Sequence, residues 1–417
     1  MPLTTSEPEQ DRIMEQKSTV GCLIDSDHEY SSELGSAFQG NSRELLKKLP
    51  DNSIDLIVTS PPFALQHQKE YKNKDQDGYN EWFLSFVPEV RRVLQPHGSL
   101  VVEIGGAFKR GWPERSEYQF ELLNRLVDED EGGMHLAQDF YWYNPAKLPN
   151  PIEWVNVRKI RVTDAVTHIW WLTPKINKDS AVEKGEHPHP EANNQRVLQE
   201  YSDSQKELLE TGEYNDGKRS SGWNIDSESF ANDNEGSIPD NFIEGHGTKP
   251  IMELLDDISA EEFLEWISGS DDLENLSAAD ICGRLGMGDR TPNNVIEASN
   301  TASNTHYLQM CREFDIDAHP ARFPRQIPEF FIDYLTPNPP YDDLDKGHLD
   351  KPIVLDIFAG SNLTGSIAEQ KGRYWLAFEK EKKYIRSSEF RFRTKEKIRK
   401  EINDKQSGLG EFPEIGE

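Results

Sequence analysis

The chain has few cysteines, no long apolar run and a deficit of basic residues. Its three cysteines, Cys22, Cys282 and Cys311, stand too far apart in the sequence for a disulfide framework or a paired-cysteine zinc site. No run reaches about 18 apolar residues, so no membrane-spanning helix is expected. The first residues lack a basic segment followed by an apolar one, so we expect no secretory signal and a cytoplasmic enzyme.

The deficit of positive charge bears on possible partners. Lysine and arginine number 46 against 75 acidic residues, a formal charge of −29. This sum argues against nucleic-acid binding, because phosphate contacts need basic side chains. Binding depends on a local face, however, and net charge is a whole-molecule sum. Residues 244–290 alone hold 12 acidic and 3 basic residues, and the remaining acidity is typical of a salt-adapted surface.

Apolar runs alternate with helical patterns along the chain. Residues 54–59 (IDLIVT) form a short β-branched run that ends in Ser-Pro-Pro, residues 80–94 have helical apolar spacing, and residues 99–106 form another apolar run. This alternation predicts an α/β fold with a mainly parallel sheet. Further strands are expected at 135–145, 168–174, 352–358 and 373–379.

Composition divides the chain into six segments. We expect a mobile N-terminal arm (1–33), a first α/β half (34–174), a loop-rich region (175–242), an acidic helical insert (243–294), a second α/β half (295–404) and a C-terminal tail (405–417). The insert is indicated by near-repeated flanks, Ile-Pro-Asp-Asn-Phe-Ile-Glu before it and Thr-Pro-Asn-Asn-Val-Ile-Glu after it. Chance similarity explains so short a match equally well.

One motif suits a nucleoside. The run Asp-Ile-Phe-Ala-Gly-Ser-Asn (356–362) is a strand end followed by a turn that opens a helix. Gly360 can take a positive φ and let a ligand approach the backbone, and Glu379 at the next strand end can accept hydrogen bonds from ribose. The fingerprints of NAD sites and P-loops are missing. An ordinary strand, turn and helix remains the alternative.

A second motif suits an amine. In Thr59-Ser-Pro-Pro-Phe63, two prolines remove two N–H donors and fix both φ angles. The carbonyls of Ser60 and Pro61 are then held outward beside the Ser60 hydroxyl and the Phe63 ring. That arrangement suits an exocyclic amine held in plane and an aromatic ring stacked on Phe63. A strand that merely ends at prolines remains the alternative.

Together the two motifs resemble those of the DNA amino-methyltransferases that use S-adenosylmethionine. The order, catalytic motif before cofactor motif, resembles the permuted β group, and Ser-Pro-Pro-Phe resembles its cytosine-N4 branch. Further similar stretches are Gly40–Leu46, Glu103–Gly106, Phe140–Pro145 and His319–Pro324, so that the resemblance covers about 36–242 and 295–395.

The resemblance implies a Rossmann-like sheet of seven strands, mainly parallel with one antiparallel strand, joined to a target-recognition region at 175–242. It implies catalysis by Ser60, Pro61, Pro62 and Phe63. It places S-adenosylmethionine against Asn41, Phe323, Pro324, Asp356, Phe358, Ala359, Gly360, Ser361, Asn362 and Glu379. Two positions depart from the pattern: the family more often has Asp at position 41 and a second Gly at position 362.

The implied chemistry follows from the weak nucleophilicity of the cytosine amine. Acceptors at Ser60 and Pro61 would favour a tetrahedral nitrogen, with direct in-line transfer and no covalent intermediate. Methylation at C5 would need a cysteine after proline, and none of the three has one. The base must also leave the duplex. Tyr141, Trp142 and Tyr143 are candidates for the pocket wall, although strand alternation makes one or two of them core residues.

Double-stranded DNA is the implied partner, with a cognate restriction endonuclease possible and no metal required. Candidate DNA contacts are basic: Lys147, Arg158, Lys159, Arg161, Lys218 and Arg219, with Lys109, Arg110 and Arg115 near a strand end. The stretch 64–79 is expected to close over substrate. Residues 276–296 have helix-turn-helix spacing, but their acidic surroundings favour protein contact or packing.

Two alternatives remain open. Adenine-N6 specificity fits the same fold, and a non-catalytic DNA-binding relative is disfavoured by the intact Ser60–Phe63 motif and Gly360. The run Asn338-Pro-Pro-Tyr341 matches the adenine-N6 signature. It follows a helical pattern and lies too close to the cofactor strand, so we interpret it as a loop.

Overall fold

The computed structural model describes the larger part of the chain. The described residues are 18–64, 76–109, 111–144, 147, 151–174, 190–211, 217–218, 224–225, 233, 235–244, 305–320, 324–338 and 350–393. The expected acidic insert, apart from residues 243 and 244, lies outside them, as do the C-terminal tail, the helix-turn-helix pattern and residues 65–75 of the loop after the catalytic motif. Among the described helices, none is long and apolar enough to cross a membrane.

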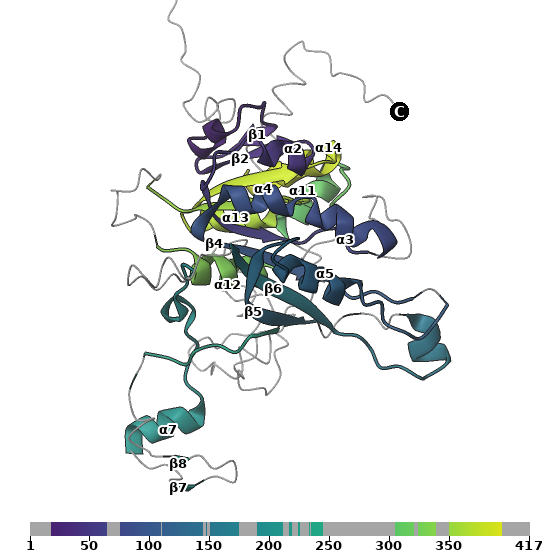
Figure 1. Ribbon diagram of the computed structural model, residues 1–417. Coiled ribbons are helices and arrows are strands. Elements are labelled where there is room, and N and C mark those ends of the chain that lie inside the picture. Colours follow the sequence, from purple (N-terminus) through teal and green to yellow (C-terminus); the bar gives the residue numbers. More distant parts are fainter. Residues whose placement is uncertain are drawn as a thin grey trace, which may run out of the picture.

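A nine-stranded mixed sheet forms the centre of the molecule (Figure 1). Its order is β1 (Tyr30–Ser31), β2 (Gly35–Gln39), β11 (Tyr374–Glu379), β10 (Ile353–Asp356), β3 (Ile54–Thr59), β4 (Leu94–Ile104), β6 (Val166–Pro174), β5 (Met134–Tyr143) and β9 (Phe242–Glu244). From β2 to β5 the strands are parallel except for β6. These seven strands confirm the predicted sheet, and the short strands β1 and β9 extend its two edges.

Helices cover both faces because each buried strand is apolar on both sides. Ile353 and Leu355 pack into one core, and Val354 between them packs into the other. The first core includes side chains of α2 (Ser42–Leu46), α3 (Gln76–Leu84), α4 (Val87–Val93) and α5 (Tyr118–Val127). The second includes side chains of α12 (Gln326–Leu335), α13 (Leu363–Gln370) and α14 (Lys382–Ser388).

The predicted helix over residues 80–94 is two helices. Helix α3 ends at Leu84, and α4 begins at Val87 with a proline in its first turn. Pro88 has no N–H to donate, so it fits the start of a helix and not its interior. Sequence periodicity continued across this break because Phe83, Val87 and Val90 all face the same core.

Residues 18–33 differ from the mobile arm expected there. Val20 and Ile24 are fully buried in the first core, and β1 pairs with β2. The Ser18 hydroxyl lies 2.8 Å from the Ser36 hydroxyl, so the segment is joined to the sheet edge by polar contacts as well. This polar segment has few apolar residues, and their spacing follows neither the helical nor the strand period. Two of them, Val20 and Ile24, are nevertheless core residues.

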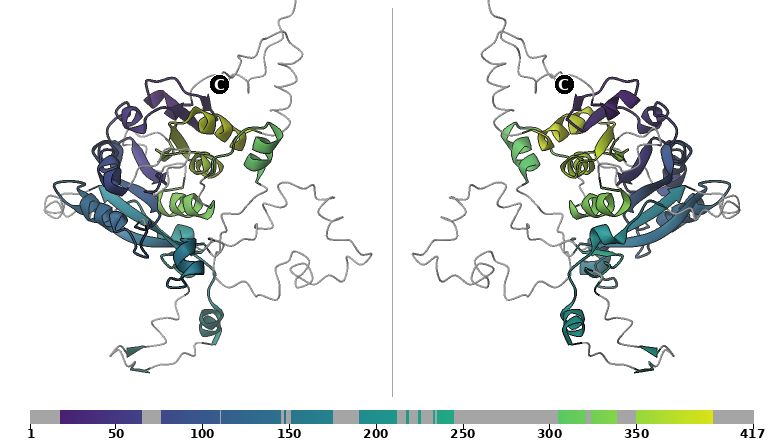
Figure 2. Two further views of the ribbon diagram at one scale, coloured as in Figure 1. Left: turned by 90° about the vertical axis from the view of Figure 1, so that its right-hand side faces the viewer. Right: turned by 90° about the vertical axis from the view of Figure 1, so that its left-hand side faces the viewer.

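Two parts of the chain stand away from the central sheet (Figures 1 and 2). Helix α7 (Asp203–Thr211) and the pair β7 (Gly217–Lys218) and β8 (Asn224–Ile225) belong to the expected recognition region. The connection between β5 and β6 forms the other, with one helical turn, η2 (Glu153–Val157). The recognition region is not separate throughout: the N–H of Asn193 donates to the carbonyl of Tyr334 in α12, and β9 joins the main sheet across the expected boundary at residue 242.

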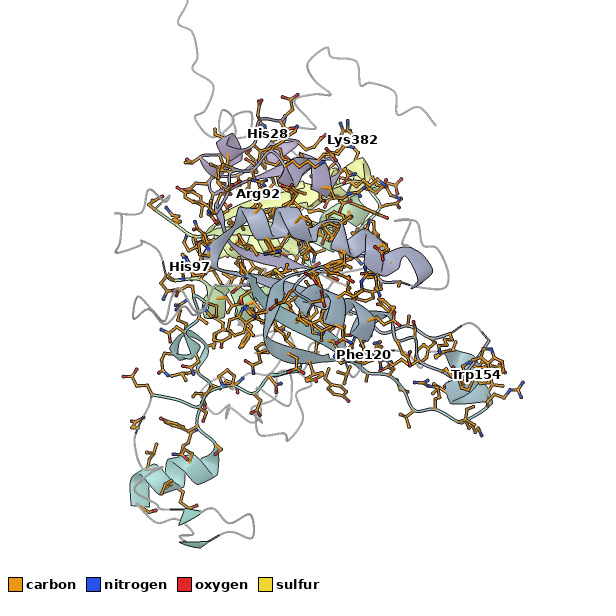
Figure 3. All side chains as sticks on the ribbon, in the orientation of Figure 1. His28, Arg92, His97, Phe120, Trp154 and Lys382 are labelled. Carbon is orange, nitrogen blue, oxygen red and sulfur yellow. The ribbon has the colours of Figure 1, made fainter. Side chains whose placement is uncertain are left out.

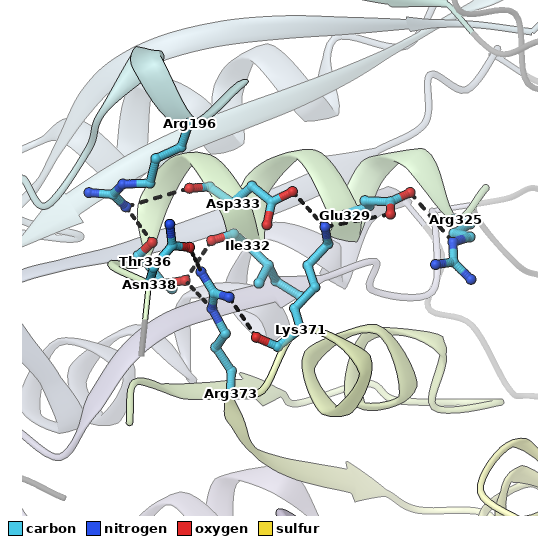
Figure 4. Close-up of polar contacts among 9 residues, drawn as sticks. All are labelled: Arg196, Arg325, Glu329, Ile332, Asp333, Thr336, Asn338, Lys371 and Arg373. Carbon is cyan, nitrogen blue, oxygen red and sulfur yellow. Dashed lines mark hydrogen bonds and ion pairs between the residues drawn. The ribbon is translucent and has the colours of Figure 1, made fainter. Parts of the chain in front are cut away.

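Helix α12 is held to the turn before β11 by a polar network (Figure 4). The buried guanidinium of Arg373 donates to the Thr336 hydroxyl (3.1 Å), the Lys371 carbonyl (2.6 Å) and the Asn338 side-chain oxygen (3.0 Å). Arg373 precedes β11, so Asn338 lies near the amino ends of the parallel strands. Active sites of such sheets lie at the carboxyl ends of the strands. The start of the Asn-Pro-Pro-Tyr run therefore has a structural role, whereas its last three residues lie outside the described part.

Candidate active site

The two motifs meet where the parallel strands end. Strands β3 and β10 are paired neighbours, so Thr59 and Asp356 lie side by side although 297 positions separate them. One carboxylate oxygen of Asp356 accepts from the Thr59 hydroxyl (2.8 Å) and from the N–H of Phe358 (3.0 Å). The other accepts from the Thr364 hydroxyl at 2.9 Å. Both oxygens therefore bond to protein groups, and Asp356 joins the catalytic strand to the turn and helix of the second motif.

Ser60 has an acidic partner from the next strand. Its hydroxyl donates to a carboxylate oxygen of Glu103, which lies near the end of β4. Glu103 is buried, and burial raises the pKa of its carboxyl to about 7. A buried carboxyl with a pKa near neutrality can accept a proton from a neighbouring group. Ser60 and Glu103 thus form a hydroxyl–carboxyl pair beside the predicted amine site.

Phe63 lies against the backbone just beyond β4. A Cβ atom at Gly105 would come within 2.5 Å of the Phe63 ring, so glycine is needed there for this close approach. The Tyr118 hydroxyl of α5 donates to the Gly105 carbonyl. The catalytic motif is therefore held in place by groups from β4 and α5.

The cofactor motif forms a tight left-handed turn. Gly360 has φ +50°, and Asn362 also lies in the left-handed region with φ 52°. The Asn362 side chain caps α13 by accepting from the N–H of Gly365 (3.1 Å) and donates to the Tyr30 hydroxyl (2.8 Å). Asparagine tolerates this left-handed conformation better than most residues with a side chain, which explains how it can stand at this position. Its side chain faces the protein, so only its backbone is available to a cofactor.

Other members of the motif are fixed by different elements. Arg391 donates to both the carbonyl (2.6 Å) and the hydroxyl (2.9 Å) of Ser361. Ala359 is buried in the second core, and its N–H donates to the Phe378 carbonyl in β11. The Phe358 ring lies 5.5 Å from that of Trp82 in α3. The turn is therefore held by contacts from β11, α3 and Arg391.

Glu379 stands beside this turn at the end of β11. One carboxylate oxygen accepts from the N–H of Gly360 (2.8 Å) and the other from the N–H of Glu381 (2.8 Å). Burial raises the pKa of the Glu379 carboxyl, and these backbone donors oppose the rise. The Glu379 carbonyl accepts from the N–H of Gly40, which places Asn41, the cap of α2, next to the same strand end.

The segment before α12 lies next to the turn. A Cβ at Gly360 would lie 3.1 Å from the His319 ring, which packs edge-on against Tyr384 at 4.4 Å. Pro324 is buried just before α12, and Phe323 lies outside the described residues. His319 and Pro324 thus lie on either side of the undescribed residues of the His-Pro-Ala-Arg-Phe-Pro stretch.

The three aromatics predicted for a base pocket separate as strand alternation requires. Trp142 is buried in the second core with Phe331, so it is a core residue. Tyr141 faces the other way, where its hydroxyl donates to Asp139 (2.5 Å) and its ring contacts His168. Tyr143 is half-buried. The role of Tyr141 and Tyr143 in a base pocket stays a prediction.

The basic candidates fall into three groups. Lys147 is close enough to Asp164 and Glu103 for their charges to act on it, although burial is the largest effect and lowers its pKa. Arg158 pairs with Glu153 (2.8 Å), Lys159 is exposed, and Arg161 donates to the Pro113 carbonyl (2.7 Å). Lys218 lies in β7 but its side chain is not described, and Arg219 lies outside the described residues, as does Arg110.

Glu103 is a candidate functional residue that pattern reasoning missed. The sequence marked it only as part of a family-like stretch, because an acidic residue inside an apolar strand run carries no local signal of its partner. The signal available was its burial: a carboxylate predicted inside a buried strand needs a donor. The donor is Ser60, 43 positions earlier.

The sheet order, the Ser60–Phe63 loop and the turn at Gly360 define an α/β methyltransferase. A family model described as DNA methylase matches residues 54–390, and the chain belongs to this family. Type II methyltransferase M.PvuII of Proteus hauseri is 41% identical over 365 residues, 87% of this chain and 85% of that protein. Type II methyltransferase M.BamHI of Bacillus amyloliquefaciens is 32% identical over 102 residues, 24% of this chain and 22% of that protein.

A solved structure agrees with this assignment. PvuII DNA methyltransferase (cytosine-N4-specific) matches with a TM-score of 0.58 and 34% sequence identity, covering 93% of this chain and 97% of that chain. The similarity therefore includes both halves of the permuted arrangement and not the cofactor motif alone.

Proposed function

We propose that this DNA methyltransferase transfers a methyl group from S-adenosylmethionine to the N4 amine of cytosine in duplex DNA. The observation that carries the proposal is the Ser60–Glu103 hydrogen bond beside the Pro-Pro turn. Asp356 joins this pair to the cofactor turn through Thr59. The choice of base is supported by the 41% sequence identity to M.PvuII, which extends over most of both chains. It is also supported by the cytosine-N4 specificity of the matching PvuII structure.

The chain's own groups account for the proton transfers. The Pro61 carbonyl accepts one N4 hydrogen, which orients the nitrogen lone pair toward the donor methyl. As the N4–CH3 bond forms, N4 becomes positively charged and must lose a proton. The Ser60 oxygen takes that proton while its own passes to Glu103, whose pKa of about 7 suits an acceptor at neutral pH. The transferred proton ends on the Glu103 carboxylate and leaves to solvent after product release.

The residues of the turn fit S-adenosylmethionine. Gly360 has φ +50°, and a Cβ there would crowd the His319 ring, so the turn that would hold the cofactor requires glycine at this position. Glu379 presents a carboxylate at the end of β11, as ribose hydroxyls require. Phe358 contributes an apolar surface. When bound, the cofactor supplies an electrophilic sulfonium methyl, and the sulfonium becomes a thioether.

Methyl transfer is tested with radiolabelled S-adenosylmethionine and duplex DNA, followed by digestion to nucleosides and mass analysis. We expect N4-methylcytosine. N6-methyladenine would reassign the base on the same fold, and absence of both transfer and cofactor binding would overturn the enzymatic function.

Pro61→Ala tests the catalytic turn itself. We expect the single-turnover rate to fall at least about 10²-fold, because alanine frees the φ angle that orients the Pro61 carbonyl. Cofactor affinity should be unchanged. Pro50→Ala, in the exposed turn before β3, is the matched control and should be active. Undiminished transfer by Pro61→Ala would remove this turn from the mechanism.

A restriction partner follows from the same proposal. The relatives named above are Type II methyltransferases. We propose that a cognate endonuclease cuts the site that this chain methylates. DNA from cells that express the chain should resist an endonuclease of that specificity once the methylated site has been mapped, and complete cleavage would contradict the pairing.

A further inference from the structure

The connection between β5 and β6 exposes an unusual set of apolar side chains. We call residues 151–162 the β5–β6 projection; its Trp154 is labelled at the far end of the molecule in Figure 3. Ile152, Val157, Ile160 and Val162 are 64%, 62%, 60% and 85% exposed. Trp112, from the loop after β4, is 62% exposed. Large apolar side chains gathered on an exposed tip mark a surface that meets a partner.

The projection is braced against the loop after β4. The Arg161 guanidinium donates to the Pro113 carbonyl (2.7 Å) and lies 4.4 Å from the centre of the Phe108 ring. Arg115 pairs with Asp164 at 3.4 Å, which ties the base of the projection to the same loop. The exposed apolar side chains are therefore presented by a supported structure with two strands at its base.

Position and charge select the partner. Strands β4 and β5 both run antiparallel to β6, so they end at the same edge as β3, which leads to Ser60. The projection and the catalytic motif thus leave the sheet from one side. Within a chain of charge −29, the projection carries three basic residues and one acidic residue. Arg158 and Lys159 lie among its exposed residues. A basic and apolar tip that leaves the sheet on the same side as a base-modifying site fits a nucleic-acid duplex.

We propose that the β5–β6 projection inserts its apolar tip into a groove of the DNA duplex and stabilises the gap left by the flipped cytosine. Apolar side chains wedged between base steps are a general means of unstacking DNA, and flipping must replace lost stacking contacts. Ile160 and Val162 supply the replacement contacts, while Lys159 and Arg158 meet the flanking phosphates. This inference rests on the proposed DNA methyl transfer and assigns a role to residues outside the catalytic motif.

The test compares a paired and an unpaired target. The double variant Ile160→Ser/Val162→Ser is assayed on a duplex with the mapped methylation site, and on the same duplex with an abasic site opposite the target cytosine. We expect kcat/KM to fall about 10-fold or more on the paired duplex and less than about 3-fold on the abasic one, where flipping is already easy. A 2-aminopurine next to the target should brighten with wild type and less with the variant.

A matched control residue lies at the opposite end of β5. Leu136→Ser changes an exposed apolar side chain there and should match wild type on both duplexes. Equal losses in kcat/KM by the double variant on the two duplexes, or no loss on either, would overturn the proposed insertion of the apolar tip. A change from dimer to monomer in the double variant, measured by sedimentation, would assign the tip to self-association and overturn it as well. Inactive wild type on both duplexes would instead contradict the proposed function.

Discussion

Glu103 is a site residue whose ionisation the fold controls through burial. It is buried on β4 between β3 and β6, and among the described side chains its hydrogen-bond donor is the Ser60 hydroxyl. A proton acceptor is useful when its pKa lies near the working pH. Burial therefore serves the proposed chemistry at a cost to the folded state.

The first prediction concerns the rate of transfer. Because ionised Glu103 accepts the proton, the single-turnover rate of wild type should rise with pH and level off above about 7. The rate of Glu103→Gln should no longer rise with pH. It should lie about 10²-fold or more below the rate of wild type, with cofactor affinity unchanged. Glu103→Asp, which keeps the acid, is the control and should retain a pH-dependent rate. An unchanged profile in the glutamine variant would exclude Glu103 as the acceptor.

The second prediction concerns stability at the same position. The folded-state pKa of Glu103, about 7, exceeds its ordinary value of 4.5, so the folded state binds more protons between those pH values. Stability should therefore fall as pH rises through this window. Glu103→Gln should be more stable than wild type at pH 8 by on the order of 3 kcal/mol and similar to it near pH 4. Urea unfolding at both pH values measures the difference; equal stability at pH 8 would contradict it.

At the scale of elements, the structure decided how strand β1 meets the cofactor helix α13 and helix α14. Strand β1 lies at a sheet edge, and its Tyr30 hydroxyl is 2.7 Å from the Ser388 hydroxyl and accepts from Asn362. One residue of the N-terminal segment thus joins the cap of the cofactor helix to the end of α14. Sequence alone indicated a mobile arm there, because a two-residue strand is too short to give an alternating pattern.

Tyr30→Phe tests this junction. Removing the hydroxyl leaves the buried Asn362 amide and Ser388 hydroxyl without that partner, so we expect a loss of about 1–2 kcal/mol in the free energy of unfolding. Cofactor affinity should weaken as well, since Asn362 shapes the turn. Tyr201→Phe, which removes a hydroxyl bonded to Asp233 at the surface, is the control and should cost less than about 0.5 kcal/mol. Similar values for the two variants would show that the junction is not stabilising.

At the scale of the whole molecule, added salt has opposite effects on the stability of a chain of charge −29 and on its affinity for DNA. Self-repulsion destabilises a compact acidic chain, and added salt screens it. Contacts between basic side chains and phosphates weaken as salt rises. The acidic excess therefore bears on solvent and habitat, while the local charge of the β5–β6 projection bears on DNA.

Salt should separate these two effects. Between 0.05 and 0.5 M KCl, as an order-of-magnitude range, we expect Tm to rise by a few degrees while affinity for duplex DNA falls at least about 10-fold. Scanning calorimetry and fluorescence anisotropy measure the two quantities. Activity that persists at molar KCl would support a salt-adapted host, whereas loss of the fold at high salt would contradict that hypothesis.

The sequence by itself determined the parts of this protein that depend on local chemistry. Apolar runs marked β3, β10 and β11, two prolines marked the end of β3, and Gly360 marked the turn before α13. Their order along the chain was enough for the family. Only the tertiary structure decided the partners: Ser60 with Glu103, Thr59 with Asp356, and Tyr30 with Asn362. Each pair joins residues that local patterns treat separately, because strand order and burial bring them together and sequence spacing does not.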